Sequence, residues 1–318
     1  MDMFLSCLLF AVGIGLVVKG GDVFVDGATW IAKALKIPTF IIGATIVSIA
    51  TTLPEMIVSV MASAEGKNEM AVGNAVGSVT ANVGLIMALA MICMTIICER
   101  KKYLFQCLML VSASAVLCVS CLGGKLHIAG SILLFVIFVL FMVQNVRSAR
   151  NDMTESTETE EKTKIEKKVL IKNILFFIIG AAAIYFGSRL MVDNGSDIAL
   201  RLGVPERVIA ITLVAIGTSL PELVTTITAI IKKESSLSIG NVIGANIMDL
   251  TIILPISSIV SGQALPVSKN SAFIDIPVCL GFILIALLPI IIKQRAYKAQ
   301  GIAMLGLYVA YIAVSIII

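Results

Sequence analysis

The stretch Thr51-Thr52-Leu53-Pro54-Glu55 decides how this chain folds, and residues 218–222 repeat it as Thr-Ser-Leu-Pro-Glu. Each copy places a carboxylate one residue after a proline, next to hydroxyl groups, inside a run apolar enough to span a bilayer. A carboxylate at membrane depth is costly unless it has a partner, so by default it indicates a functional site. Two such carboxylates in matching positions predict one site with internal symmetry.

Composition indicates a polytopic membrane protein. Of 318 residues, 58% are hydrophobic and 14% are charged, and the mean hydropathy is +1.04, whereas about a quarter of the residues in soluble domains are charged. A helix needs roughly 20 apolar residues to cross the hydrocarbon core. The charged breaks predict an all-α integral membrane fold with ten transmembrane helices, at residues 3–21, 38–64, 70–98, 103–122, 126–147, 170–190, 205–231, 237–262, 271–292 and 300–318.

The cysteines and the single histidine do not favour a metal centre. Only Cys118 and Cys121 form a CxxC pair, and no second pair or partner histidine lies near them in sequence. We interpret the cysteines as small apolar residues of helices, and we expect His127 to face water. No cofactor is expected.

The distribution of Lys and Arg predicts the orientation in the membrane. With ten spans and the N-terminus outside, the outer side holds only six of the 24 basic residues, namely Lys67, Lys125, Arg189, Arg201, Arg207 and Lys269. This is a strong positive-inside bias. We therefore expect a protein of the cell (inner or plasma) membrane with both termini extracytoplasmic. Loop lysines near anionic membrane lipid explain the net charge of +4 without a nucleic-acid partner.

The chain divides into two similar halves. Residues 148–168 are acidic and rich in Ser and Thr, which predicts a flexible cytoplasmic linker between a first repeat at residues 1–147 and a second at 169–318. A shift of 167 positions aligns residues 37–86 with 204–253 without a gap and with 14 identities, so the shared motifs are 43–86 and 210–253. Because each half has five spans, the second copy must be inverted. Secondary transporters often use inverted repeats, with the substrate site at the midplane.

Each copy offers hard oxygen ligands at mid-membrane. Pro54 and Pro221 cannot donate to the carbonyl four residues earlier, so we expect both helices to break there and leave carbonyls free. Carbonyl, hydroxyl and carboxylate oxygens suit Ca²⁺, Na⁺ or Mg²⁺.

The spans that follow carry small and polar residues. GxxxG pairs at Gly73/Gly77 and Gly240/Gly244 predict close helix approach. A polar ladder lies beside them, formed by Asn74, Ser78 and Asn82 in the first copy and by Asn241 and Asp249 in the second. We expect four polar groups to converge at the midplane, namely Glu55, Glu222, Asn82 and Asp249.

These motifs resemble a known family. Thr-Ser-Leu-Pro-Glu followed by Gly-Asn-x-x-Gly-Ala-Asn-x-x-Asp, in two inverted copies, resembles the α-repeats of the cation/Ca²⁺ exchanger superfamily, and within it the prokaryotic sodium/calcium exchangers. The resemblance covers essentially the whole chain. It implies an antiporter with ten helices, in which one Ca²⁺ or several Na⁺ bind a diamond of ligands and the first and sixth helices slide across the other eight.

The resemblance also implies residue roles. The Ca²⁺ ligands would be Glu55, Glu222 and oxygens of Thr51 and Thr218, with Asn82 and Asp249 completing the central position. The flanking Na⁺ sites would use Thr52, Ser219, Ser78 and the backbone carbonyls of Ser48 and Ala215. The chain departs from the family pattern at Ala50-Thr51-Thr52, where Gly-Thr-Ser is usual, at Val79, where an asparagine is usual, and at Ala245, which removes a hydroxyl from one Na⁺ site.

Several alternatives share this chemistry. Asp249 stands opposite Asn82 and could hold a proton or K⁺, which would fit a Ca²⁺/H⁺ or a K⁺-dependent Na⁺/Ca²⁺ exchanger. The Ca²⁺/H⁺ branch usually has glutamate where Gly77 and Gly244 stand. A cation channel would use the same ligands, although inverted repeats favour alternating access. An enzyme is not expected, because an intramembrane aspartyl protease needs a GxGD motif and Lys19 precedes Gly20-Gly21-Asp22.

Overall fold

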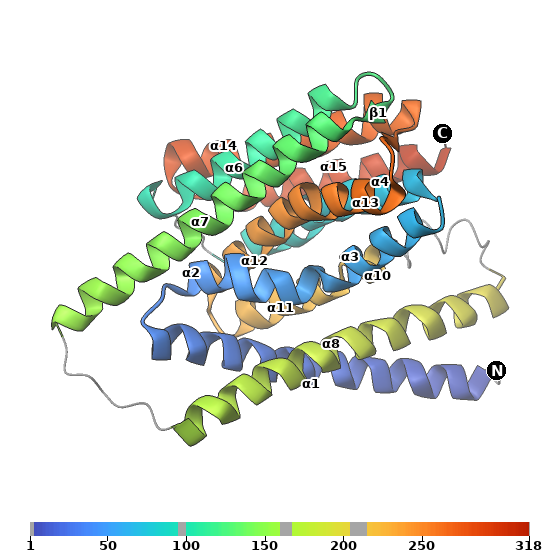
Figure 1. Cartoon of the computed structure of the whole chain (residues 1–318). Helices are drawn as coiled ribbons and strands as arrows, with labels where there is room; N and C mark the ends of the chain where they lie inside the picture. The colour runs from blue at the N-terminus through green and yellow to red at the C-terminus, as the bar shows by residue number, and fades with distance from the viewer. Residues whose placement is uncertain (1–2, 95–99, 160–166, 204–214, 318) are drawn as a thin grey trace.

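The protein is almost entirely helical in the part of the chain that the computed structural model describes, residues 3–94, 100–159, 167–203 and 215–317 (Figure 1). One short antiparallel pairing joins β1 to β2. The elements in chain order are α1 (Met3–Leu35), α2 (Thr39–Ile42), η1 (Gly43–Val47), α3 (Ser48–Ala64), α4 (Asn68–Ala81), η2 (Asn82–Met87), α5 (Ala88–Cys93), α6 (Arg100–Ser120), β1 (Lys125–Leu126), α7 (Ile128–Thr159), α8 (Lys167–Arg201), α10 (Ala215–Thr218), α11 (Leu220–Ile231), α12 (Ser235–Met248), η4 (Asp249–Ile253), α13 (Leu254–Ser261), β2 (Leu265–Pro266), η5 (Ser271–Asp275), α14 (Ile276–Lys293) and α15 (Lys298–Ile317), where η denotes a π-helical turn.

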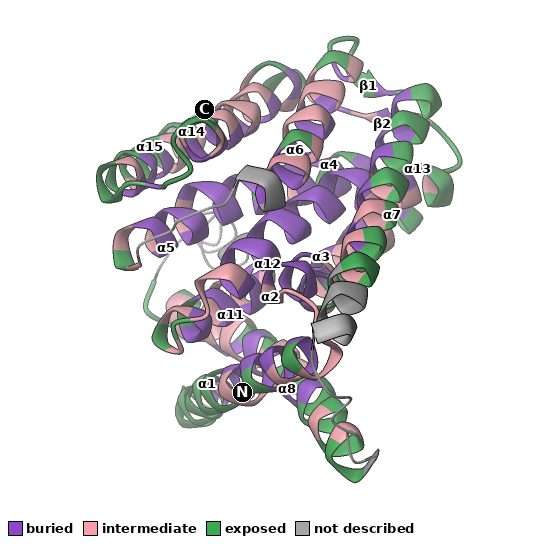
Figure 2. Ribbon diagram, turned by 90° about the vertical axis from the view of Figure 1, so that its left-hand side faces the viewer, coloured by how far each residue is buried: buried purple, intermediate pink, exposed green. Residues whose placement is uncertain are grey.

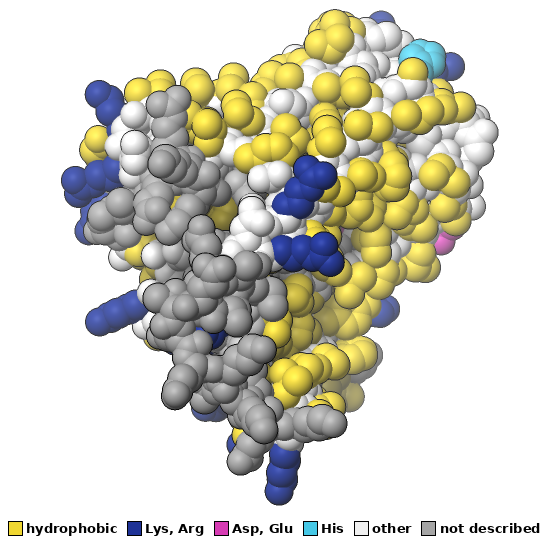
Figure 3. Space-filling view, turned by 60° about the vertical axis from the view of Figure 1, so that its left-hand side comes forward, with side chains coloured by type: hydrophobic (Ala, Val, Ile, Leu, Met, Phe, Trp, Pro, Cys, Tyr) yellow, Lys and Arg dark blue, Asp and Glu magenta, His cyan; other side chains and the backbone are white. Residues whose placement is uncertain are grey.

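The prediction of an all-α membrane fold is confirmed. Among the described residues, nine helical segments are long and apolar enough to cross a membrane, and α11 is a shorter apolar helix. The predicted seventh span contains α10 and α11, and its residues 205–214 lie outside the described part. Much of the surface is apolar, with Lys and Arg side chains projecting between and around the hydrophobic areas (Figure 3). An apolar exterior of this extent is what lipid contact requires.

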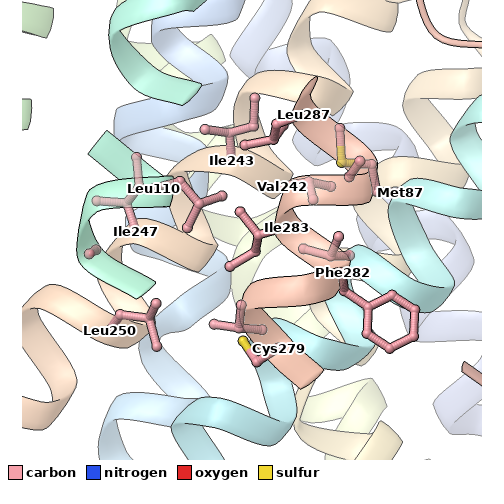
Figure 4. Close-up of a cluster of buried hydrophobic side chains, with 14 of the residues drawn as sticks. Met87, Leu110, Val242, Ile243, Ile247, Leu250, Cys279, Phe282, Ile283 and Leu287 are labelled. Carbon is pink, nitrogen blue, oxygen red and sulfur yellow. The ribbon is translucent and has the colours of Figure 1, made fainter. Parts of the chain in front are cut away.

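The helices differ sharply in burial. In the span formed by α12, η4 and α13, 83% of an apolar stretch of 18 residues is buried, whereas the corresponding share in α8 is 11%. Figure 2 shows the buried α12 between the outer helices. An apolar cluster packs α12 against α6 and α14, and Figure 4 shows its side chains, among them Leu110, Ile243, Ile247 and Ile283. The central helices are therefore fixed by a packed core.

The outermost pair, α1 and α8, lies at one side of the molecule (Figure 1). A methyl group at Gly20 would lie 2.8 Å from Ala183 Cβ, and one at Gly180 would lie 2.6 Å from the backbone nitrogen of Phe24. Glycines therefore let the two backbones approach each other closely. We interpret α1 and α8 as one unit.

Both outer helices are longer than the predicted spans 3–21 and 170–190. They have 33 and 35 residues, or about 50 Å at 1.5 Å per residue. The prediction ended the first span at the charges near Asp22, but α1 continues because Asp22 and Asp26 are paired with Lys232. Helices of this length must tilt or extend past a hydrocarbon core of ~30 Å.

The two five-helix repeats are inverted copies in the fold. The π-helical turns η2 and η4 begin at Asn82 and Asp249, which are 167 positions apart as the sequence alignment requires. Two repeats of five spans put both ends of the chain on the same side of the membrane, and the N and C labels in Figure 1 lie at the same end of the bundle. Symmetry-related backbone irregularities thus mark matching positions in both halves.

The helix breaks expected at the two prolines differ between the repeats. In the second repeat Ser219 interrupts the helix between α10 and α11, two residues before Pro221. In the first repeat α3 continues through Pro54, so the predicted break is wrong there. A proline removes one backbone donor. The helix α3 continues past Pro54 without that backbone hydrogen bond.

The segment predicted as a linker is partly helical. The helix α7 runs to Thr159, well past residue 148, and α8 begins at Lys167. Residues 160–166 lie outside the described part of the chain. A boundary between the two repeats at this point stays a prediction. The first half of the predicted linker continues the helix α7.

The two GxxxG pairs have different surroundings. On α12, a methyl group at Gly244 would lie 2.5 Å from the Ala44 carbonyl oxygen, and one at Gly240 would overlap that of Phe40. Close approach is therefore confirmed for the second repeat. It is wrong for the first, where methyl groups at Gly73 and Gly77 would have no neighbour within 4 Å. These two glycines line a cavity of about 240 Å³, whose lining also includes Tyr308 and Tyr311 of α15.

Alanine substitutions at matching glycines should therefore have different effects. Gly244→Ala should lower the thermal unfolding midpoint, because overpacking a backbone contact costs about 1–3 kcal/mol. Gly77→Ala, its control in the other repeat, should be neutral or mildly stabilising, because alanine is favoured over glycine in a helix by ~1 kcal/mol. Thermal unfolding in detergent measures both, and equal shifts would contradict the packing difference.

Candidate ion-binding site

The first half of the candidate site lies on α3. Ser48, Thr51, Thr52 and Glu55 are at most 4% exposed. Their spacing of three to four residues puts them along one face of the helix. The exposed positions Ile49, Leu53 and Ile57 alternate with them, so α3 turns its polar face inward and its apolar face outward.

The second half comes from the helix break of the other repeat. Ser219 lies at the break, and Glu222 lies in the first turn of α11, where the helix dipole favours a negative charge. Both side chains are 2% exposed or less. The Ser219 hydroxyl donates a hydrogen bond of 3.4 Å to Glu55 Oε1. The Glu222 carboxyl group in turn lies near the hydroxyl groups of Thr51 and Thr52. Each carboxylate therefore lies beside hydroxyl groups of the opposite repeat.

Three buried carboxylates act on one another here. The charges of Glu222 and Asp249 both repel that of Glu55, and the charge of Glu222 repels that of Asp249. Burying like charges together is costly unless cations or protons compensate them. The described side chains give these carboxyl groups no Lys or Arg partner. The arrangement therefore favours a bound cation.

The positions of Asn82 and Asp249 support the same conclusion. Each is the first residue of a π-helical turn and is 1% exposed. Both side-chain oxygens of Asp249, both polar atoms of Asn82, and one oxygen each of Glu55 and Glu222 have no hydrogen-bond partner. Buried polar atoms normally have partners, and leaving them without one costs about 1–3 kcal/mol each. π-helical turns also occur frequently at functional sites.

The remaining predicted ligands are less closely joined to the carboxylates. The Ser48 carbonyl accepts a long hydrogen bond of 3.4 Å from Thr51. Ala215 and Thr218 form the ends of α10. Ser78 is buried with its hydroxyl unpartnered and lines the cavity beneath α15. The structure thus brings Glu55, Glu222, Thr51, Thr52 and Ser219 together directly.

Two asparagines of the polar ladder were not predicted as site residues. Thr51 donates a hydrogen bond of 3.1 Å to Asn241 Oδ1 on α12. Asn74 Nδ2 donates to the Glu55 carbonyl at 3.3 Å and to Ser59 at 2.9 Å. They occupy matching positions next to Gly240 and Gly73, and this repetition was the signal available in the sequence. Asn74 braces α3 from its own repeat, and Asn241 does so from the other.

The oxygen-rich composition limits the kind of ion that the site can hold. Among the described residues no three His, Cys, Asp or Glu side chains form a compact metal cluster, and His127 is exposed before α7. A cation here would need hydroxyl, amide and carbonyl oxygens together with the carboxylates. Such a ligand set suits hard cations that lose water readily, such as Ca²⁺ and Na⁺.

Comparison with known proteins agrees with the fold and the motifs. Residues 5–146 and 172–317 match the sodium/calcium exchanger protein family. Sodium/calcium exchanger MaX1 of Methanosarcina acetivorans is 32% identical over an alignment that covers 96% of this chain and 97% of the relative. The uncharacterized membrane protein MJ0091 of Methanocaldococcus jannaschii is 33% identical over 312 residues, 96% of each chain.

A solved structure has the same architecture. The sodium-calcium exchanger NCX_Mj soaked with 10 mM Na⁺ and zero Ca²⁺ matches with a TM-score of 0.84 and 30% identity, over 98% of this chain and 99% of that one. The resemblance inferred from the two Pro-Glu motifs is confirmed. The chain belongs to the sodium/calcium exchanger protein family.

Proposed function

We propose that the protein is a secondary active antiporter that exchanges Na⁺ for Ca²⁺ at one shared midplane site. The observation that carries the proposal is the contact between the two repeats at their carboxylates. Glu55 accepts a hydrogen bond from Ser219 and is repelled by the charge of Glu222. Glu55 lies in the first half of the chain, and Ser219 and Glu222 lie in the second. Membership of the sodium/calcium exchanger family supports the choice of ions.

Charge balance explains why the two ions would exclude each other. The pair Glu55 and Glu222 balances one Ca²⁺, and the same pair balances two Na⁺, with Asp249 available for a third. Because both loads use the same oxygens, one must leave before the other binds. Exchange follows if only the loaded, neutralised site crosses the low-dielectric barrier. Sodium entering down its gradient would then drive calcium out.

We assign the ligands as the family resemblance implies. Ca²⁺ would bind Glu55 and Glu222 with oxygens of Thr51 and Thr218, and Asn82 and Asp249 would complete the centre. Na⁺ would use Thr52, Ser219, Ser78 and the carbonyls of Ser48 and Ala215. Ala245 is the residue of the second repeat that corresponds to Ser78, and its side chain is fully buried. One Na⁺ position would therefore lack a hydroxyl ligand and bind more weakly.

A cavity of about 280 Å³ supports access from one side. It lies between α3 and α8 and reaches Pro54, Gly217, Thr218 and Pro221, which are immediate neighbours of the proposed ligands. With both termini extracytoplasmic, as the Lys and Arg distribution predicts, this cavity is on the outer side. The conformation would therefore admit ions from outside.

Removing either charge should abolish exchange. Glu55→Gln and Glu222→Gln preserve side-chain shape but leave one negative charge where Ca²⁺ needs two. We expect Na⁺-dependent ⁴⁵Ca²⁺ uptake into proteoliposomes to fall to the level of protein-free vesicles. Glu69→Gln, an exposed position on α4, is the control and should transport normally. Normal uptake by either Glu55→Gln or Glu222→Gln would refute the site. Uptake by the unmodified protein without a Na⁺ gradient, or unitary currents through it, would indicate a channel.

A coupled K⁺ or H⁺ is the second candidate, and it rests on the buried, unpartnered carboxylate of Asp249. For plain Na⁺/Ca²⁺ exchange we expect uptake to continue when K⁺ is replaced by choline and when the pH gradient is dissipated. The measurement varies K⁺ and pH independently while the Na⁺ gradient stays fixed. Loss of uptake without K⁺ would indicate a K⁺-dependent exchanger, and uptake that follows pH without Na⁺ would indicate Ca²⁺/H⁺ exchange.

A further inference from the structure

The α1/α8 unit contacts the two repeats unequally. Near one end, Gly21 of α1 packs on α11, where an added methyl group would lie 2.7 Å from Thr228 Oγ1 and 2.9 Å from Val224 Cγ1. The residues 167 positions away from this contact are Ser188 on α8 and Ile57 and Met61 on α3, and all three line the open cavity of about 280 Å³. The same interface is therefore closed in one copy and open in the other.

The two turns that follow α3 and α11 have matching backbone hydrogen bonds. The amide of Glu65 donates to the carbonyl four residues earlier at 3.0 Å, and that of Lys232 does so at 2.9 Å. The next residues, Gly66 and Lys233, have φ of +78° and +60°. The amides of Lys67 and Glu234 each close the turn at 2.8 Å. Glu65 and Lys232 thus occupy equivalent places with opposite charges.

The charges facing these turns are also reversed. Asp22 on α1 corresponds to Arg189 on α8, and Asp26 corresponds to Asp193. At the closed end, Lys232 Nζ lies 2.7 Å from Asp26 and 3.7 Å from Asp22, and it donates to the Asp22 carbonyl at 3.1 Å. This group of three, which we call the Lys232 latch, joins the α1/α8 unit to the core.

At the open end each charge has a partner on its own element. Glu65 binds Lys67 at 2.7 Å within the turn, and Arg189 lies 3.7 Å from Asp193, one turn further along α8. All four side chains are more than half exposed. Local partners of this kind are weak. They leave Glu65 and Arg189 free to exchange partners when the cavity closes.

We propose that Glu65 and Arg189 form a second latch, which closes when the Lys232 latch opens, so that the α1/α8 unit is held by an ion pair of opposite polarity at each end of its movement. The inference rests on the proposed alternating access and names residues that position the moving unit without touching the ions. It also predicts a bias. In the state described here Lys232 pairs with two carboxylates. In the alternative state Glu65 would pair with Arg189, but Asp193 beside Arg189 would repel Glu65. The state described here should therefore be the more populated one.

Cross-linking tests the movement without ions. In protein with its seven cysteines replaced by alanine, Met61→Cys and Ser188→Cys report closure of the cavity through a short bis-maleimide. We expect Lys232→Gln to raise the cross-linking rate roughly fivefold, because an exposed pair shifts a two-state balance by about that factor. Arg189→Gln should lower it. Lys233→Gly, which removes the neighbouring charge and fits the positive φ, should change nothing. Equal rates in all variants would overturn the proposal.

Charge exchange tests the second latch in transport. Glu65→Arg and Arg189→Glu should each slow Na⁺-driven ⁴⁵Ca²⁺ uptake several-fold, and the double variant should recover at least half of it, which a variant that merely misfolds could not do. Single variants without effect, or a double variant no faster than the singles, would overturn the latch. If the unmodified protein itself shows no Na⁺-driven uptake, the proposed function fails instead, and the cross-linking rates still report on the latch.

Discussion

The fold is arranged around the meeting of two buried glutamates from opposite repeats. Bringing Glu55 and Glu222 together without a Lys or Arg partner among the described side chains costs more than the local hydroxyl bonds return. Everything near them is consistent with this constraint. The break at Ser219 puts a hydroxyl on Glu55, and the dipole of α11 stabilises Glu222. A bound cation or a proton would supply the missing compensation, and a cation that binds and leaves again is what the proposed exchange requires.

The sequence predicted the parts of this arrangement that follow from local pattern. Hydropathy predicted the spans, and the 167-residue offset predicted that Glu55 would meet Glu222. Polar residues in an apolar run, repeated in an inverted copy, left few other arrangements open. The family resemblance, later confirmed by a match over most of the chain, rested on the same residues.

The predictions that failed depend on partners far away in sequence. Asp22 looked like the end of a span because its partner Lys232 lies 210 residues further on. Gly77 and Gly244 look alike in sequence, yet only Gly244 meets backbone, because what faces a glycine is decided by another helix. The bond from Thr51 to Asn241 likewise joins two repeats. Local pattern indicates which residues are unusual and leaves open which neighbour each will have.

The small pairing of β1 with β2 has a wider consequence. It fastens the turn after α6 to the segment after α13, so a hairpin of the first half is clasped to the second half. At the periphery, too, the halves are mixed, because α1 of the first half packs against α8 of the second half. The two halves inherited by duplication are therefore not the two bodies of the folded protein. A chain cut between α7 and α8 would give fragments that each lack half of the core and half of the outer pair, and neither could complete its interior without the other.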